Sequence, residues 1–285
     1  MTGWLIYGKK EAEKNKWFIS ELLKYAKEKD ILLEMVYAEE IQAGINGKRV
    51  VFVNGEERKF PDFALNRSIF PFLSKFLENA GVKVYNSSFV AEICNDKRKT
   101  HEFLSDKEIP MMETYFFDRR FFDFEKSLPL SFPMIVKPSN GHGGEGIVLA
   151  ENKDSLKEAV LSYKTDEFLI QKPCSDVGKD MRVYIMGKTV LAAMLRISET
   201  DFRSNFSLGG RAERKFLSRD EEELVLKVAD LFNFTYAGID FIFDNGKMVL
   251  NEIEDVVGAR MLYEYTDLEP HKLLIDFIKE ERNGI

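Results

Sequence analysis

Residues 137–146 combine one lysine with a cluster of glycines. Lys137 and Pro138 are followed within eight positions by Gly141, Gly143, Gly144 and Gly146. Glycine has no Cβ, so its backbone N–H groups can approach an anion closely, and a fixed lysine adds a full positive charge. The stretch therefore predicts a loop that cradles phosphate groups. A flexible surface hairpin is the alternative.

The residues on either side of this loop restrict its type. Its glycines match G-x-G-x-x-G, but a dinucleotide fingerprint needs a helix directly afterwards, and Ile147–Ala150 has the pattern of a strand. A Walker loop ends in Gly-Lys-Ser/Thr, whereas this lysine precedes the glycines. Protein kinases also have a strand–glycine loop–strand lid, but no His-Arg-Asp or Asp-Phe-Gly follows here. These comparisons favour a glycine-rich lid over a nucleotide.

Three carboxylates form the second candidate cluster. Asp240 lies in an apolar run before Asn245-Gly246, and Glu252 and Glu254 lie in the run that follows, so this segment predicts a hairpin. Converging carboxylates repel one another unless a cation lies between them, and all-oxygen ligands suit Mg²⁺. An exposed acidic hairpin without a metal is the alternative.

The register of this hairpin decides whether the carboxylates meet. A two-residue turn would pair Asp240 with Asn251 and place Glu252 on the opposite face. A three-residue loop with a glycine bulge pairs Phe243 with Lys247 and places the three acids on one face. We predict the bulged register because it leaves five apolar residues together on the core-facing side: Ile239, Phe241, Phe243, Val249 and Ile253.

Composition limits the class of protein. The 285 residues are 45% hydrophobic and 31% charged, as in soluble globular proteins, and the net charge of −7 argues against non-specific nucleic-acid binding. Cys94 and Cys174 lack the spacing of a zinc site. No run of about 18 apolar residues and no signal-peptide core are present. We expect a cytoplasmic protein with neither a membrane nor a nucleic-acid partner.

The first 95 residues alternate helix and strand patterns, as a small α/β domain does. They include a helix predicted over 11–27 and a strand over 63–68. Asn66 and Arg67 fall at the carboxyl end of that strand, where open α/β sheets bind ligands. A capped loop start explains the same two residues equally well.

Further along, 181–186 and 189–194 predict a hairpin, and residues 201–213 hold too few apolar side chains to pack as an element. Ser218 and Glu221 form a capping box that begins a helix.

These motifs, in this order, resemble the ATP-grasp superfamily, most closely the branch of RimK-type ribosomal-protein glutamate ligases and glutathione synthetase. The match covers roughly residues 94–265 and rests on an ordered set of segments: Asp96-Lys97, Ile109-Pro110, Ile135–Pro138 with the glycine loop, Ile170–Pro173, Asp180–Arg182, Asp201–Asn205, Gly209-Gly210, Gly238–Asp240 and Asn251–Glu254. The resemblance implies an α/β protein in three parts. A pre-ATP-grasp domain (1–95) is followed by a lid subdomain with its preceding helix (96–187) and a carboxyl-terminal subdomain with the metal site (188–285), both built on antiparallel sheets.

The resemblance also implies residue roles. ATP phosphates would contact Lys97, or Lys99 if the alignment slips, together with Lys137 and the lid glycines Gly143 and Gly144; His142 could also touch a phosphate. The remaining ATP contacts would come from Gln171, Lys172, Pro173, Cys174 and Asp180. The γ-phosphate and acyl phosphate would be neutralised by Arg182 and Arg203, with Asn205 close by. Two Mg²⁺ ions, for which Mn²⁺ can substitute, would be held by Asp240, Glu252 and Glu254.

The chain departs from the family pattern in two places, the first of which concerns the substrate. Relatives usually carry asparagine followed by Pro-Gly where this chain has Glu254–Gly258, a segment that helps to shape the acceptor pocket, and Lys172 replaces a frequent acid. Arg260 is a candidate for binding a substrate carboxylate or phosphate, with a helix-surface arginine as the alternative.

The implied activity is ATP-dependent ligation of a carboxylate to an amine through an acyl phosphate, with release of ADP and phosphate. The acceptor would be an amino acid, peptide or protein, and relatives often form dimers or tetramers. The alternatives are a ligase of free small molecules of the D-alanine–D-alanine or glutathione type, a nucleotide-binding regulatory protein and a kinase. Lys137, Arg203, Asp240 and Glu252 are all present, which favours catalysis.

Overall fold

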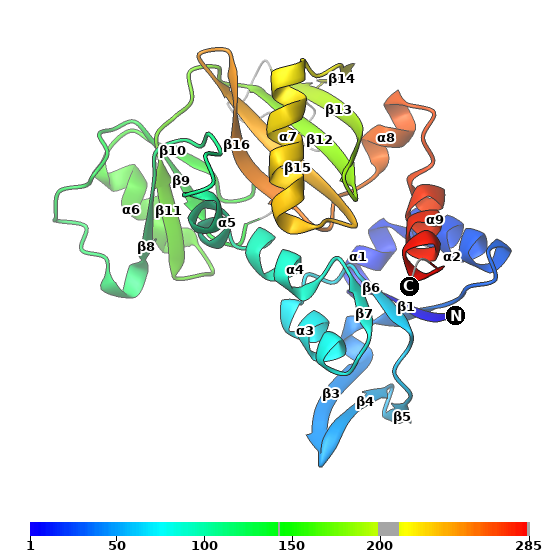
Figure 1. Cartoon of the computed structure of the whole chain (residues 1–285). Coiled ribbons are helices and arrows are strands. Elements are labelled where there is room, and N and C mark those ends of the chain that lie inside the picture. Colours follow the sequence, from blue (N-terminus) through cyan, green and yellow to red (C-terminus); the bar gives the residue numbers. More distant parts are fainter. Residues whose placement is uncertain (142, 199–210, 284–285) are drawn as a thin grey trace.

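The computed structural model describes residues 1–141, 143–198 and 211–283, which fold into an amino-terminal domain and two further subdomains (Figure 1). Each of these parts is built on its own sheet. The strand orders are β2-β1-β6-β7, β10-β9-β11-β8 and β14-β13-β12-β15-β16, with a small sheet β3-β4-β5 beside the first. Within these ranges no helix has both the length and the apolar character needed to cross a bilayer.

The amino-terminal domain is the predicted α/β unit, with four parallel strands in its main sheet. Trp4 and Ile6 pack on one face of β1, and Leu5 and Tyr7 pack on the other. The elements are β1 (Thr2–Tyr7), α1 (Lys9–Lys14), α2 (Lys16–Glu28), β2 (Leu32–Tyr37), η1 (Ala38–Glu40), β3 (Ile41–Asn46), β4 (Lys48–Val53), β5 (Glu56–Arg58), β6 (Phe63–Asn66), α3 (Pro71–Asn79) and β7 (Lys83–Tyr85).

The expected helix over 11–27 is interrupted. Asn15 lies between α1 and α2 with a φ of −112°, outside the helical range. Its side-chain amide donates a 2.7 Å hydrogen bond to the Glu11 carbonyl, which offers the backbone an alternative to a continuing helix. Lys14 and Asn15, at this break, line a cavity between the amino-terminal domain and the carboxyl-terminal sheet.

The lid subdomain contains the predicted strand–glycine loop–strand. Val136 on β9 lies opposite Val148 on β10 in an antiparallel pair, so the loop between them folds back on itself. Helix α6 packs beneath this sheet around Phe168. The connecting helices and the lid elements are α4 (Ser88–Cys94), α5 (Lys97–Leu104), β8 (Thr114–Asp118), η2 (Arg119–Phe121), β9 (Met134–Pro138), β10 (Val148–Ala150), α6 (Lys153–Ser162) and β11 (Glu167–Gln171).

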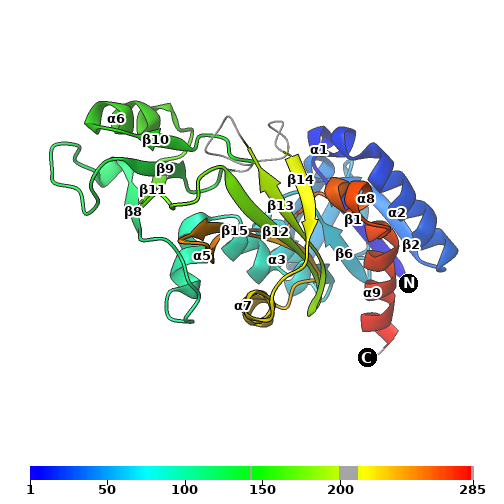
Figure 2. The ribbon, with the colours of Figure 1, turned by 90° about the horizontal axis from the view of Figure 1, so that it is seen from above.

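The carboxyl-terminal sheet has one apolar face and one face that carries charged residues. Side chains alternate along a strand, so Met181, Val183 and Ile185 pack against α7, while Arg182 and Tyr184 point to the other face. Figure 2 shows α7 lying along one side of this sheet. The elements are β12 (Lys179–Met186), β13 (Thr189–Ile197), β14 (Arg211–Lys215), α7 (Arg219–Phe232), β15 (Tyr236–Asp244), β16 (Lys247–Glu254), α8 (Arg260–Tyr265) and α9 (Pro270–Asn283).

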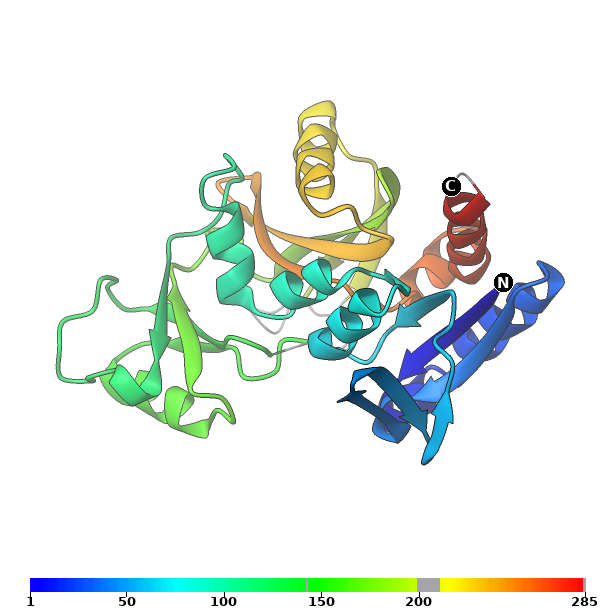
Figure 3. The ribbon, with the colours of Figure 1, turned by 60° about the horizontal axis from the view of Figure 1, so that its bottom comes forward.

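The last two helices return to the first domain. In Figure 1, α9 lies beside α2, and Leu274, Ile275 and Ile278 join the same buried cluster as Leu22 and Phe63. Figure 3 shows α4 and α5 running between the first domain and the lid, below the carboxyl-terminal sheet. The two ends of the chain therefore share one hydrophobic core.

Two expectations about boundaries need correction. The expected division at residues 187/188 falls within the β12–β13 hairpin, in which Met186 lies opposite Thr189, so we propose a boundary between β11 and β12 instead. The polar stretch 201–213 is not wholly without structure, because its last residues, Arg211–Glu213, begin β14. There the hydrogen bonds of a sheet edge outweigh the shortage of apolar side chains.

The predicted hairpin register was wrong at the turn. Asp244 lies opposite Lys247, so the turn has two residues, Asn245 and Gly246, both with positive φ. The bulge lies instead at Asn251, between the pairs Phe241–Leu250 and Asp240–Glu252. Between the turn and this bulge, the side chains of β16 therefore face the opposite way from the prediction.

The bulge therefore keeps the predicted alignment of Asp240 with Glu252 and Glu254, but it changes which apolar residues of β16 face the core. Met248 and Leu250 face the core in place of Val249.

Candidate active site

Three acids on the charged face of the carboxyl-terminal sheet lie together as predicted. Asp240 on β15 and Glu252 and Glu254 on β16 each offer a carboxylate oxygen, and these oxygens all lie within 4.8 Å of one another. Asp240 is almost fully buried, and the two glutamates are partly exposed. An all-oxygen donor set of this size fits a hard divalent cation.

Arginines from the two neighbouring strands offset these negative charges. Arg182 on β12 lies opposite Asp240 in the sheet and donates two hydrogen bonds to it, at 2.8 and 2.7 Å, and a third contact of 2.7 Å reaches Glu254. Arg196 on β13 pairs with Asp180 at 2.5 and 2.7 Å and reaches Asp240 at 2.8 Å. These buried pairs fix the position of each carboxylate.

The cations determine which acids stay ionised. Burial opposes the charged form of Asp240, but Arg182 and Arg196 outweigh that effect and lower its pKa to about 2. Burial likewise opposes ionisation of Glu252, and Lys97 nevertheless brings its pKa below the ordinary value. Burial raises the pKa of Glu254 despite the nearby Arg182. Asp240 and Glu252 are therefore held in the anionic form, and burial makes Glu254 harder to ionise than an exposed glutamate.

A cavity of about 300 Å³ separates the lid sheet from the carboxyl-terminal sheet. Its walls combine apolar residues such as Ile135, Leu149 and Ile242 with Lys137 and Glu252. A cavity whose wall combines apolar side chains with a few charged groups fits a base together with its phosphates.

Lys137 lines this cavity, and Lys97 contacts Glu252 and the glycine loop beside it. Lys137 on β9 donates 2.8 Å hydrogen bonds to Gln171 on β11 and to Asn251 at the bulge of β16. Burial lowers its pKa to about 8. Lys97 at the start of α5 pairs with Glu252 at 3.1 Å and donates to the Gly141 carbonyl. Lys99, the alternative in the sequence, instead pairs with Glu92 on the surface.

The other predicted nucleotide contacts also line this cavity. Gly144, Gln171, Pro173, Cys174 and Asp180 lie on its wall, as does Lys172, whose residue is otherwise exposed. Gly146 at the end of the loop has a φ of +73°, and a Cβ there would lie 3.1 Å from Pro138 and 3.3 Å from Tyr163, so only glycine fits without strain.

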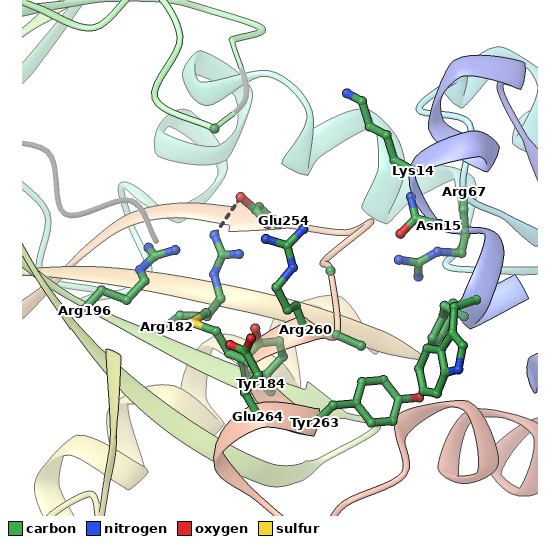
Figure 4. Close-up of a pocket in the computed structure, with 16 residues that line it drawn as sticks. Lys14, Asn15, Arg67, Arg182, Tyr184, Arg196, Glu254, Arg260, Tyr263 and Glu264 are labelled. Carbon is green, nitrogen blue, oxygen red and sulfur yellow. Dashed lines mark ion pairs between the residues drawn. The ribbon is translucent and has the colours of Figure 1, made fainter. Parts of the chain in front are cut away.

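A second cavity, of about 460 Å³, lies between the amino-terminal domain and the charged sheet face (Figure 4). Arg182, Arg196 and Glu254 line one side of it. Arg67, Lys14 and Trp17 from the first domain line the other side, and Arg260 on α8 reaches in between them. Gly143 lines this cavity and Gly144 lines the first, so the glycine loop separates the two.

Some predicted residues lie elsewhere. His142, Arg203 and Asn205 fall outside the described residues. The side chain of Asn66 donates to Ser74 at 2.8 Å and accepts from Ser68, so it stabilises the end of β6.

Sequence reasoning missed four residues of the site: Arg196, Asn251, Lys14 and Trp17. Arg196 is a charge within the apolar run 190–197, which could have marked it. Asn251 depends on the bulge, whose position the sequence does not reveal. No feature of the sequence marks His101 as a site residue either. It lies 3.4 Å from the Asn251 carbonyl, and burial, with Lys137 next, lowers its pKa to about 4.

Comparison with known proteins now adds to this geometry. A model of the RimK-like ATP-grasp domain matches residues 94–278. Human N-acetylaspartylglutamate synthase A is 29% identical over 269 residues, covering 88% of this chain and 68% of that protein. A probable alpha-L-glutamate ligase from Shewanella loihica is 30% identical over 211 residues, 72% of this chain and 69% of that protein.

Among solved structures, D-alanine–D-alanine ligase from Bacillus anthracis in complex with ATP superposes with a TM-score of 0.73 at 17% identity, covering 98% of this chain and 96% of that chain. At this identity the likeness shows the fold alone. The chain spans about two thirds of the length of the first curated relatives, 66% and 68%.

Proposed function

Because the chain belongs to the RimK-like ATP-grasp family, we propose that it joins a carboxylate to an amine at the expense of ATP, with ADP and phosphate as the other products. ATP-dependent carboxylate–amine ligation is the reaction class that the family and its ligase relatives support, and use of ATP with a divalent metal ion is typical of it. The residue roles below belong to this proposal.

The main observation in support of this proposal is that the carboxylates lie between the two cavities. Glu252 lines the cavity under the lid, and Glu254, two residues later on the same strand face, lines the cavity beside the amino-terminal domain. Asp180 and Arg196, which pair with each other, are divided between the two cavities in the same way. A phosphoryl group at this cluster would be reachable from both sides.

In the proposed reaction, ATP occupies the cavity under the lid, with its phosphates near Lys97, Lys137 and the glycine loop. A substrate carboxylate in the second cavity attacks the γ-phosphorus, the bond to the ADP oxygen breaks, and an acyl phosphate forms. An amine then attacks the acyl carbon, and phosphate leaves. The amine loses a proton on the way to the amide. Arg182 and Arg196 stabilise the charge that develops on the transferring oxygens.

Asp240, Glu252 and Glu254 would hold the metal, and we propose two Mg²⁺ ions, which Mn²⁺ can replace. Bound metal supplies positive charge against the phosphate oxygens. The chain's own part is positional: Arg182 orients Asp240 and Glu254, and Lys97 orients Glu252.

The names of two relatives contain glutamate. We propose that the amine substrate here is likewise an acidic amino acid, free or joined to a peptide or protein. Cytoplasmic location, a dimeric or tetrameric state and the absence of a nucleic-acid partner stay predictions.

The test is ADP release by the purified chain with MgATP, screened against pairs of carboxylates and amines, with the products weighed by mass spectrometry. We expect ADP only when both substrates are present, together with a product one condensed residue heavier. ADP release with a phosphorylated product would indicate a kinase. Nucleotide binding without turnover by any pair would favour a regulatory role.

A further inference from the structure

Arg67 is a buried cation whose charge has no counter-ion in the described part of the chain. It follows the last residue of β6 and is only 6% exposed. One guanidinium nitrogen donates a 2.7 Å hydrogen bond to the Val257 carbonyl, and Nε has no partner. Asp255 lines a small hollow with Arg67 and feels its charge, but no ion pair joins the two, and burial raises the pKa of Asp255 to about 7, so this acid offsets the charge of Arg67 only in part. A single carbonyl therefore satisfies part of the hydrogen-bonding capacity of this guanidinium and does not neutralise its charge.

Aromatic rings hold the guanidinium in place. Its central carbon lies 5.7 Å from the ring centroids of Tyr7 and Phe18 and 6.0 Å from that of Tyr236. Ring faces attract a cation, but they do not offset the loss of hydration as an anion does. Burial of an unpaired charge is unfavourable, and the buried, ring-packed side chain has little freedom to move out to water. The site is thus preorganised for a carboxylate.

The same cavity holds two further cations without carboxylate partners among the described residues. Lys14 at the end of α1 and Arg260 at the start of α8 line the cavity beside Arg67, and neither forms an ion pair within the described ranges. Across the cavity, Arg182 and Arg196 are already paired with acids of the sheet. In Figure 4 the guanidinium of Arg67 points toward Arg260, with Arg182 and Arg196 on the far side. Among the described residues, positive charge without a carboxylate partner therefore gathers at the end of the cavity that Arg67 lines.

We propose that Arg67 binds a carboxylate of the substrate remote from the reacting centre, so that the enzyme selects a substrate with two carboxylates or more. This inference rests on the proposed ligase function and adds a specificity residue to it. Arg260 and Lys14 contribute further positive charge, and the edge-to-face pair of Trp17 and Tyr263, with ring centroids 4.8 Å apart, forms an apolar wall for the carbon chain between the anionic groups.

The location of Arg67 in the chain separates it from the shared catalytic domain. The family match begins at residue 94, so both Arg67 and Lys14 lie before it. ATP and metal contacts would come from the matched region, and recognition of the second carboxylate from the amino-terminal domain. A change at Arg67 should therefore alter substrate choice and leave nucleotide binding intact.

The test compares amino acids that differ only by a carboxylate and its amide. Binding of L-glutamate and L-glutamine, L-aspartate and L-asparagine, and the N-acetylated form of each is measured by calorimetry, with a non-hydrolysable ATP analogue and Mg²⁺ present. Wild type, Arg67→Met, Arg67→Lys and the exposed control Arg219→Met are compared. Thermal unfolding and nucleotide affinity check that each variant is folded.

We expect wild type to prefer one carboxylate over its amide by about 30-fold or more, as a buried charged hydrogen bond requires. Arg67→Met should reduce that ratio to near one by weakening the carboxylate alone, Arg67→Lys should be intermediate, and Arg219→Met should match wild type. Equal weakening of both members of the pair would mean that Arg67 only supports the fold, and would overturn the inference. So would a wild type that prefers no carboxylate in the panel.

A different result would count against the proposed function alone. If the Arg67-dependent preference is found but no substrate pair releases ADP, the site recognises the acid and ligation is wrong.

Discussion

The charges at the carboxylate cluster are balanced before any ligand binds. Asp240, Glu252 and Glu254 each contact at least one of three cations, Lys97, Arg182 and Arg196. Asp180 adds a fourth acid through its pair with Arg196, and Lys137, in the same cavity wall as Glu252, adds a fourth cation. A metal ion or a phosphate alone would disturb this balance. The two together bring charges of both signs, so the arrangement suits MgATP better than either part.

Removal of one charge from the proposed metal site should strongly lower turnover. We expect Glu252→Gln to lower ADP release on the order of 100-fold. The fold should persist because the amide keeps the shape of the side chain and its oxygen can still accept from Lys97. Glu222→Gln on the exposed side of α7 is the matched control. Unchanged Mg-dependent turnover in Glu252→Gln would remove this residue from the metal site.

Lys137 should make ATP binding depend on pH. Burial lowers its pKa to about 8, so the side chain is charged below that pH and largely neutral above it. A neutral amine attracts phosphate less strongly, and one pH unit above the pKa leaves about a tenth of the amine protonated. We expect ATP affinity to fall by up to about tenfold between pH 7 and pH 9 in calorimetric titrations.

The control for this pH dependence is Lys137→Met, which should bind ATP weakly with a flatter profile. The same slope in both proteins would assign the titration to another group.

At the scale of elements, strand alternation carries most of what the sequence could reveal. It predicted the glycine lid between two strands and the three acids on one sheet face, and both were correct. It could not place the bulge, because a two-residue turn with a bulge at Asn251 aligns the same acids as a bulged turn would. Nor could it predict contacts between distant elements, such as the bond from Arg67 to the Val257 carbonyl across 190 positions.

Gly238 on β15 lies close to Val257 and to Arg182, and Arg182 lines the second cavity. A Cβ at this position would lie 2.7 Å from a methyl group of Val257 and 3.6 Å from Cδ of Arg182. We expect Gly238→Ala to lower the free energy of unfolding by about 1–3 kcal/mol, as overpacking does. The KM for the carboxylate substrate should also rise, because Val257 holds Arg67.

Gly246→Ala is the control that distinguishes a loss of stability from a change in the geometry of the site. Its φ is +72° and a Cβ at this position would meet no described atom within 4 Å, so the variant should lose stability by about 1 kcal/mol without a change in KM. A higher KM in this control as well would mean that any loss of stability disturbs the site.

At the scale of the whole molecule, the amino-terminal domain and the last helices form one folding unit. Leu274 on α9 is fully buried in the cluster that includes Leu22 and Phe63 of the first domain. The second cavity is lined by Lys14 and Arg67 on one side and by Arg260 on another, so the same packing sets its width. The second cavity therefore depends on contacts between the two ends of the chain.

Shortening one side chain in this shared core should destabilise the amino-terminal domain and the last helices together. We expect Leu274→Ala to destabilise the protein by about 2–5 kcal/mol, measured by urea unfolding followed with fluorescence and circular dichroism. Leu161→Ala, at a 56% exposed position on α6, should change stability by less than about 0.5 kcal/mol. A separate unfolding transition of the amino-terminal domain that Leu274→Ala leaves unmoved would contradict a shared core.

The central claim is that the substrate carboxylate takes the γ-phosphoryl group of ATP before the amine attacks. The direct measurement uses a carboxylate substrate labelled with ¹⁸O in both carboxylate oxygens, and follows the released phosphate by mass spectrometry. An acyl phosphate transfers one labelled oxygen to each phosphate released, and we predict that result whenever the amine is present. ADP and unlabelled phosphate would mean that water, not the carboxylate, attacks ATP, and would contradict the account.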